Sequence, residues 1–215
     1  MQLADLLWGV FLLLGWEHAR IIPDFTPGTP FEFFNYPISH SLVAALAGGV
    51  AGAALYYSWP TRDTTRHWQA SALVGIAIFS HYPLDVLVHV PDLPLAGNDS
   101  PKLGLGLWNY PVATMVAELG VLVLGVVIYV VLRSQRHPVR ATRLAVLLLI
   151  LLGTYFGTQF EPLPPSTMVV AITEKIGQAK LKFDMVFMLA IGGLAAWADR
   201  RATPDELAAR RVSPP

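Results

Sequence analysis

Cysteine is absent from the 215-residue chain, and charged side chains are scarce. Without cysteine the chain can form no disulfide, no thiolate metal site and no cysteine nucleophile, so any metal ion must be held by His, Asp or Glu. Charged residues make up 14% of the chain, whereas they are about one-quarter of an ordinary soluble domain. The 15 basic and 15 acidic residues give a formal net charge of zero. Because no basic surplus is left to neutralise phosphates, we expect no nucleic-acid partner.

Three common catalytic signatures are also missing. The chain has no GxSxG motif, no P-loop and no HExxH motif, which are the usual sequence signs of serine hydrolases, nucleotide-driven enzymes and zincins. Serines do stand beside histidines, as in Ser39-His40. Neighbouring residues on a helix point about 100° apart, so we expect no serine–histidine catalytic pair.

Hydrophobic residues make up 54% of the chain. A membrane-spanning helix needs about 20 mostly apolar residues, and six stretches approach this length. They lie at 3–22, 38–58, 68–90, 111–132, 142–161 and 181–198. We therefore predict an all-α, polytopic integral membrane bundle of about six transmembrane helices. It forms a single domain over residues 1–198, followed by a polar cytoplasmic tail at 199–215.

The ends and loops of this bundle can be oriented from the sequence. The first stretch carries no basic leader and no small-x-small cleavage site, so we expect a retained span rather than a signal peptide. Ten of the 15 lysines and arginines follow the second, fourth and sixth stretches. Because short cytoplasmic loops collect Lys and Arg, both termini are placed in the cytoplasm. The loops 23–37, 91–110 and 162–180 then face outward.

Ionisable residues of the spans gather in the outward half of the bundle. In the third stretch, His81, Asp85 and His89 follow one another at intervals of four residues, which places them on one face of a helix. Pro83 lacks a helical N–H and is expected to kink this helix where the polar face begins. Since an ionisable side chain in a span costs a few kcal/mol, such a cluster indicates a polar interior or a bound partner.

The residue types of this cluster indicate a metal site. Imidazole and carboxylate together suit zinc and other first-row divalent ions, so we expect a divalent cofactor, zinc first, with manganese, iron or magnesium as alternatives. The second stretch adds His40, in the first turn of a helix that Ser39 is expected to cap. The candidate metal ligands are the outward-half residues His40, His81, Asp85, His89, Asp24 and His18.

Two further acidic residues are candidates for proton transfer. Glu118 lies two turns below the outer surface in the fourth stretch, and Asp92 lies just past the expected end of the third. A carboxylate in such a place is a metal ligand, a general base or the partner of a histidine. Each of these residues also has a purely structural interpretation, as a helix-pairing group. The segment Glu17-His18-Ala19-Arg20 can likewise be an ion pair at the membrane interface.

The order of these motifs resembles that of a known family. The elements His18, Pro23-Asp24, Ser39-His40-Ser41 and Ser80-His81-Tyr82-Pro83-Leu84-Asp85 are similar to those of the YdjM/YbcI-like family of bacterial membrane-bound proteins, which are described as metal-dependent hydrolases. The resemblance covers residues 15–95 and implies metal ligation by His40, His81 and Asp85, with Asp24 as a further candidate. It also implies a location in the bacterial inner membrane. The His-x-x-x-Asp element is similar to one in zinc-dependent phospholipase C, which suggests phosphoester chemistry.

Three functions fit these features. The first is a metal-dependent hydrolase, in which the ion activates a water and polarises an ester or phosphoester oxygen of a lipid-like substrate. The second is an ion or proton transporter that uses the same cluster, although the inner halves of the spans offer few polar partners. The third is a structural membrane subunit. The expected partners are membrane lipids and a lipid-like or small-molecule substrate; the sequence predicts neither the substrate itself nor the oligomeric state.

Overall fold

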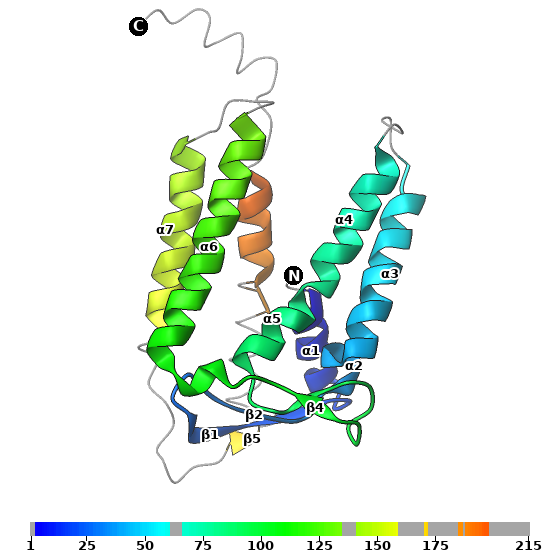
Figure 1. Cartoon of the computed structure of the whole chain (residues 1–215), viewed down its shortest axis with the longest axis vertical. Helices are drawn as coiled ribbons and strands as arrows, with labels where there is room; N and C mark the ends of the chain where they lie inside the picture. The colour runs from blue at the N-terminus through cyan, green and yellow to red at the C-terminus, as the bar shows by residue number, and fades with distance from the viewer. Residues whose placement is uncertain are drawn as a thin grey trace, which may run out of the picture. The chain divides into compact units, whose positions relative to one another are not determined.

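Figure 1 shows a computed structural model of the chain, which describes residues 3–60, 66–134, 141–158, 170–171, 185–186 and 188–197. The described part is mostly helical, as the sequence predicts. The chain divides into two units, residues 1–123 with 163–186 and residues 124–162 with 187–215. The boundary between them falls within one helix, α6 (Pro111–Ser134).

The first expected span is helical over only part of its length. Helix α1 (Leu3–Leu13) ends because Gly15 takes a left-handed φ of 70°, which residues with a side chain rarely adopt. The amide of Gly15 donates to the Leu12 carbonyl at 3.1 Å, and the amide of Trp16 donates to the Phe11 carbonyl at 2.8 Å. This pair of bonds closes a helix C-terminus. The prediction of one helix over 3–22 is therefore wrong beyond residue 13.

A β-hairpin follows, where the sequence analysis expects an outward loop. Strands β1 (His18–Thr26) and β2 (Thr29–Asn35) pair antiparallel around a turn at Pro27-Gly28. The short strand β5 (Val170–Ala171) pairs with the other edge of β1. The β2 sequence TPFEFFN is rich in aromatic residues, which favour strands. The all-α prediction misses this small sheet because the turn residues between the strands are also typical of a loop.

The second expected span is divided between two helices. The short helix α2 (Pro37–His40) is separated from α3 (Leu42–Ser58) by extended backbone at Ser41. The Ser41 hydroxyl accepts a hydrogen bond from the amide of Ala44 at 3.0 Å. Ser41, and not Ser39 as predicted, therefore caps the long helix.

Helix α4 (His67–Phe79) packs closely against α3 through glycine residues. A Cβ atom on Gly49 would lie 2.9 Å from the carbonyl oxygen of Gly75, and a Cβ on Gly75 would lie 2.8 Å from that of Gly49. Only glycine permits this approach of the two backbones. Small residues at helix crossings are typical of membrane helix pairs.

The third expected span is kinked, as Pro83 predicts. Helix α5 (His81–Val88) begins directly after α4, and Ser80 separates the two. A proline lacks the N–H that would bond to the fourth preceding carbonyl, and its ring crowds that carbonyl. For Pro83 this carbonyl belongs to Phe79, the last residue of α4. The interruption therefore falls where the physical chemistry of proline requires it.

The connection from α5 to α6 carries a small core of its own. It holds three short elements, β3 (Leu93–Pro94), β4 (Lys102–Leu103) and the 3-10 helix η1 (Leu107–Asn109). Leu93 is fully buried and packs with Tyr36 and Tyr82. This packing fixes the connection beside α2 and α5, close to the polar residues at the end of α5.

The second unit contains the end of α6, helix α7 (Ala141–Thr158) and an apolar helix at Met188–Trp197. The guanidinium of Arg143 lies over the ring of Trp197, 5.0 Å from its centroid, and donates to the Trp197 carbonyl at 3.2 Å. These contacts join α7 to the last described helix. The predicted tail at 199–215 lies outside the described residues.

Two helical stretches are long and apolar enough to cross a membrane. They are His67–Val88, formed by α4 and α5, and Pro111–Leu132 in α6. Only 17% and 0% of their apolar windows are buried, so neither is a core helix of the described structure. The other apolar helices among the described residues are shorter than this criterion. The six-span bundle therefore stays a prediction.

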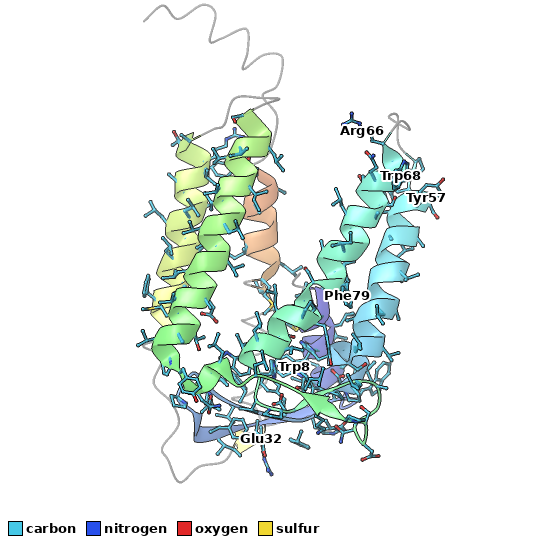
Figure 2. All side chains as sticks on the ribbon, in the orientation of Figure 1. Trp8, Glu32, Tyr57, Arg66, Trp68 and Phe79 are labelled. Carbon is cyan, nitrogen blue, oxygen red and sulfur yellow. The ribbon has the colours of Figure 1, made fainter. Side chains whose placement is uncertain are left out.

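Aromatic side chains lie at both ends of the α3–α4 pair. Figure 2 shows Tyr57 and Trp68 at one end and Trp8 near the other. Between them, large apolar side chains are open to the surroundings, with Val50 71% and Leu55 73% exposed. An exposed apolar band with aromatic residues at its ends is typical of helices in a bilayer.

Candidate metal centre

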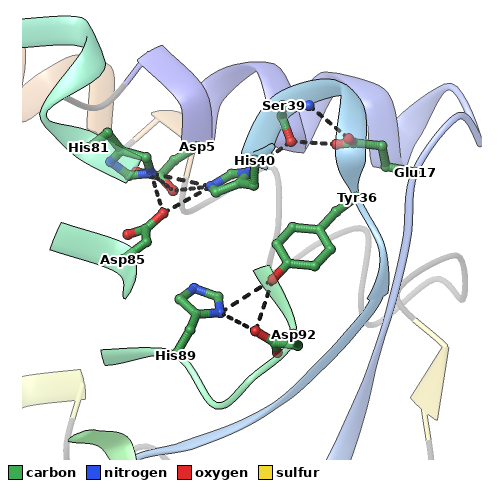
Figure 3. A network of polar contacts seen from close by, with 9 residues as sticks. All are labelled: Asp5, Glu17, Tyr36, Ser39, His40, His81, Asp85, His89 and Asp92. Carbon is green, nitrogen blue, oxygen red and sulfur yellow. Dashed lines mark hydrogen bonds and ion pairs between the residues drawn. The ribbon is translucent and has the colours of Figure 1, made fainter. Parts of the chain in front are cut away.

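Four side chains from three helices of the first unit meet at one point (Figure 3). Asp5 comes from α1, His40 from α2, and His81 and Asp85 from α5. The ligand atoms of Asp5, His40 and His81 all lie within 4.8 Å of one another. Asp85 Oδ2 lies 3.1 Å from His81 Nε2 and 3.8 Å from His40 Nε2. The structure brings together three ligands that the sequence predicts and adds Asp5 to them.

The spacing of these atoms fits a single first-row ion. The Nε2 atoms of His40 and His81 are 3.2 Å apart, and Asp5 Oδ1 lies 3.4 Å and 3.5 Å from them. Two ligands that each lie about 2.1 Å from a tetrahedral zinc ion are themselves about 3.4 Å apart. These side chains can therefore hold an ion with little rearrangement.

Local structure explains why the ligands face one another. His81 and Asp85 lie one turn apart on α5, so their side chains share a face of that helix. His40 is the last residue of α2, and the extended backbone at Ser41 turns the chain away from it into α3. The helix is interrupted at Ser80, so His81 begins a new helix, α5, and does not continue the apolar helix α4.

Three residues of the cluster, His40, His81 and Asp85, line a cavity of about 50 Å³. Because a water molecule in the liquid occupies about 30 Å³, the cavity has room for a small ligand beside the side chains. Structural zinc sites are closed, whereas catalytic sites keep one position open for water or substrate. The cavity wall also includes apolar residues of α1, α3 and α4, namely Ala4, Leu7, Ala44, Ala45 and Ile78.

The cluster contains a buried oxygen, Asp85 Oδ2, that lies beside two imidazoles but makes no hydrogen bond with them. Asp85 Oδ2 is buried and, within the described ranges, receives no hydrogen bond. A buried polar atom without a partner costs free energy, and a carboxylate oxygen costs more. The two carboxylates and two imidazoles of the cluster offer chiefly acceptor atoms. A divalent cation among them would satisfy all four groups at once.

A second buried carboxylate lies behind His40 (Figure 3). Glu17 is 0% exposed, and its Oε1 accepts hydrogen bonds from the amides of Ile38 and Ser39 at 2.7 Å and 2.8 Å. Its Oε2 accepts the Ser39 hydroxyl at 2.6 Å, and Ser39 Oγ also lies 2.7 Å from His40 Nδ1. The expectation that Ser39 and His40 point apart is therefore wrong. The Ser39 proton is directed to Glu17, so the serine links the carboxylate to the imidazole.

His89 and Asp92 form a separate group with Tyr36. Helix α5 ends one residue before His89, whose backbone is extended with ψ of 146°, so this side chain leaves the face of His81 and Asp85. His89 Nδ1 lies 2.9 Å from Asp92 Oδ1, which also accepts the Tyr36 hydroxyl at 3.0 Å. Burial, together with the Asp92 carboxylate, raises the pKa of Tyr36 far above its usual range, so the phenol stays a donor. The structure does not bring His89 or Asp92 into the cluster.

The remaining candidate residues lie in other elements. His18 begins β1, and its Nδ1 lies 3.3 Å from the side-chain amide of Asn35 on the paired strand. Asp24 is in β1, but its side chain falls outside the described part of the chain. Glu118 is in α6 and, among the residues that the structure describes, makes no hydrogen bond or ion pair with the cluster. Neither His18 nor Glu118 is therefore a ligand in this arrangement.

The sequence analysis overlooks two residues of this site, Asp5 and Glu17. Asp5 is the one ionisable residue between Leu3 and Leu14. An ionisable side chain in a membrane span costs free energy whether it is Asp5 or His81, so the same argument could have identified Asp5. Glu17 looks like a partner of Arg20 from its position in the sequence. In the structure Arg20 pairs instead with Glu32 across the hairpin.

No family model, curated protein or solved structure matches this chain. The resemblance to the YdjM/YbcI-like family therefore stays a prediction from the motifs alone. Of the residues on which it depends, His40, His81 and Asp85 lie in the cluster, whereas His18 lies in the hairpin.

Proposed function

We propose that the chain is an integral membrane metal-dependent hydrolase whose divalent ion is held by Asp5, His40 and His81, with Asp85 beside it. The observation that carries this proposal is that the ligand atoms of Asp5, His40 and His81 lie within 4.8 Å of one another, with Asp85 close to both imidazoles. Two imidazoles and two carboxylates suit zinc first, and manganese, iron or magnesium next. Asp5, His40 and His81 would hold the ion and Asp85 would lie beside it, so that a position stays open for water; the ion would lower the pKa of that water and polarise an ester or phosphoester oxygen.

The membrane location is supported by the outward surface of the helices. Two helical stretches have the length and composition of a span, and α3, α4 and α6 expose large apolar side chains such as Val50, Leu73 and Val116. Such surfaces are costly in water and favourable in hydrocarbon. In this proposal the chain is a multi-pass protein of a bacterial inner membrane, with both termini in the cytoplasm.

The wall of the cavity supports a lipid-like substrate. Five apolar side chains from α1, α3 and α4 line the cavity together with the ligands. A water-soluble substrate would find few hydrogen-bond partners on this wall, whereas an acyl chain would gain apolar contact. An ester or phosphoester group at the head of such a chain would reach the ligands while the chain stayed in apolar surroundings.

Metal content of the purified protein tests the centre first. We expect near-stoichiometric divalent metal by inductively coupled plasma mass spectrometry. Asp5→Asn and His81→Ala each remove one ligand, and since changes to outer-shell partners alone cost about 10–100-fold in affinity, we expect at least that loss. Glu118→Gln removes a carboxylate outside the cluster and is expected to leave metal binding unchanged, which makes it the matched control.

Hydrolysis is tested with the solubilised, metal-loaded protein and mixed micelles of phosphatidylglycerol. Release of free fatty acid shows ester hydrolysis, and release of the headgroup shows phosphoester hydrolysis. We expect one of these products with the native chain and its loss with Asp5→Asn. A native chain that binds no zinc, manganese, iron or magnesium would refute the proposed centre. Metal binding without either product would favour the ion transporter instead.

A further inference from the structure

We infer that Glu17, acting through Ser39, fixes the tautomer of His40 so that the Nε2 lone pair faces the metal cluster. Glu17 is then a positioning residue, because it touches neither the ion nor the substrate. The consequence for metal binding rests on the proposed function. The tautomer itself is a property of the metal-free protein and can be measured independently.

The direction of each hydrogen bond follows from the donors available. A carboxylate only accepts, so Glu17 receives protons from two backbone amides and from the Ser39 hydroxyl. A hydroxyl has one proton to donate, and that of Ser39 is already directed to Glu17 at 2.6 Å. In its 2.7 Å contact with His40 Nδ1, Ser39 Oγ must therefore accept.

The protonation of the imidazole follows from this contact. If Ser39 accepts, His40 Nδ1 carries the proton, and a neutral imidazole then has a lone pair on Nε2. It is Nε2 that lies 3.2 Å from His81 Nε2 and 3.4 Å from Asp5 Oδ1. Metal ligation requires this lone pair. In the opposite tautomer Nε2 carries the proton, so an N–H would point into the cluster and His40 could not bind the ion.

Burial makes this arrangement effective. Glu17, Ser39 and His40 are all less than 8% exposed, so water has little access to replace any of the three bonds. The ring of Trp8 packs edge-on against the imidazole, with centroids 6.3 Å apart, which further limits rotation of His40. Outer-shell carboxylates commonly orient metal-binding histidines in this way, although usually without an intervening serine.

The substitution Glu17→Gln reverses the two hydrogen bonds of Ser39 Oγ while keeping the size of the side chain. The glutamine oxygen still accepts from the two backbone amides, but its NH₂ group donates to Ser39 Oγ. The Ser39 proton must then point to His40 Nδ1, which leaves the imidazole proton on Nε2. The two amide bonds keep their direction and the two bonds of Ser39 Oγ are reversed, so no bond is lost and the fold is expected to be retained.

Nitrogen-15 NMR of histidine-labelled, metal-free protein in micelles measures the tautomer directly. The His40 signals are assigned by their loss in His40→Gln. The spectra are recorded at alkaline pH, where the imidazole is neutral despite Asp5 and Asp85 near Nε2. We expect the proton on Nδ1 in the native chain and on Nε2 in Glu17→Gln. Zinc affinity, measured by competition with a chelator, is expected to fall about 10–100-fold in Glu17→Gln.

Three further variants separate positioning from folding. Glu32→Gln removes a carboxylate of the hairpin that follows Glu17, one paired with Arg20, and is expected to change neither the tautomer nor the zinc affinity. Ser39→Ala keeps the amide bonds to Glu17 but removes the link to His40, so we expect mixed tautomers and weaker zinc binding. Ser39→Thr retains a hydroxyl and is expected to restore both properties.

The outcomes distinguish this inference from the proposed function. An unchanged His40 tautomer in folded Glu17→Gln or Ser39→Ala would overturn the inference, even if both variants bind zinc. A native chain with a protonated Nδ1 that binds no metal would support the inference and refute the metal centre.

Discussion

Tyr36 connects segments that are far apart in the sequence. Its hydroxyl donates to Asp92 Oδ1 at 3.0 Å, and its ring lies 5.4 Å from that of Phe33 and 5.5 Å from that of His40, between centroids. The other Asp92 oxygen, Oδ2, is buried and receives no hydrogen bond from the part of the chain that the structure describes. The Tyr36 hydroxyl and His89 therefore provide most of the compensation for burying this carboxylate.

Replacing Tyr36 by phenylalanine tests how far the buried Asp92 carboxylate depends on the Tyr36 hydroxyl. Because Asp92 would lose a donor in a buried place, we expect Tyr36→Phe to lower the free energy of unfolding by about 1–3 kcal/mol. Zinc affinity should be unchanged, since Tyr36 is outside the cluster. Tyr82→Phe is the matched control: the buried Tyr82 hydroxyl donates to the uncharged Pro94 carbonyl at 3.3 Å, so we expect a smaller loss. Chemical unfolding in micelles measures both, and equal losses would contradict this role of Tyr36.

Single residues of the site differ in how far the sequence can predict them. His81 and Asp85 are one turn apart, so a local helical pattern is enough to place them together. Asp5 and Glu17 reach His40 only because α1 ends at Gly15 and the chain reverses into the hairpin. No local periodicity encodes that reversal. His89 shows the opposite error, since the interval of four continues in the sequence while the helix ends before it.

At the scale of elements, the crossing of α3 and α4 depends on which glycine lies in the contact. A Cβ on Gly49 would meet the Gly75 carbonyl oxygen at 2.9 Å, and this backbone atom cannot move alone. We expect Gly49→Ala to destabilise the protein by about 1–3 kcal/mol. A Cβ on neighbouring Gly48 would lie 3.6 Å from Ile78 Cγ2, an ordinary contact. Since alanine favours a helix over glycine by about 0.5–1 kcal/mol, Gly48→Ala should be neutral or stabilising.

Thermal unfolding in micelles, followed by circular dichroism, distinguishes these two variants. Opposite effects at adjacent positions would confirm that backbone contact, and not glycine content, determines the crossing. Similar effects at both positions would contradict the close approach of the helices. Because α5 continues from α4, a displaced crossing in Gly49→Ala is also expected to weaken zinc binding.

The elements also show which structures a hydrophobic pattern can predict. The stretch at 111–132 nearly matches α6 (Pro111–Ser134), because a long apolar run without interruptions has one favourable structure. The prediction of a helix over 3–22 is wrong because a hydropathy pattern does not detect that Gly15 has a positive φ and ends the helix. The hairpin is missed because apolar and turn residues mix within 18–35, and the pairing of distant segments is not a local property.

At the scale of the whole molecule, the absence of cysteine allows a direct test of topology. Helix α6 has 24 residues, about 36 Å at 1.5 Å per residue, which exceeds the about 30 Å of hydrocarbon in a bilayer. Asp99, before this helix, and Ser134, at its end, are both exposed. Each can be replaced by cysteine in a chain that has no other thiol.

With the arginine-rich connection after α6 in the cytoplasm, a membrane-impermeant maleimide should label Asp99→Cys in intact cells. It should label Ser134→Cys only after the membrane is made permeable. Labelling of both positions in intact cells would contradict a membrane-spanning α6. The reverse pattern would keep the span but invert the orientation, and it would move the connection at 91–110 to the cytoplasmic side. That connection packs against α5 through Leu93 and Tyr82, so the result also decides on which side of the membrane the candidate metal centre lies.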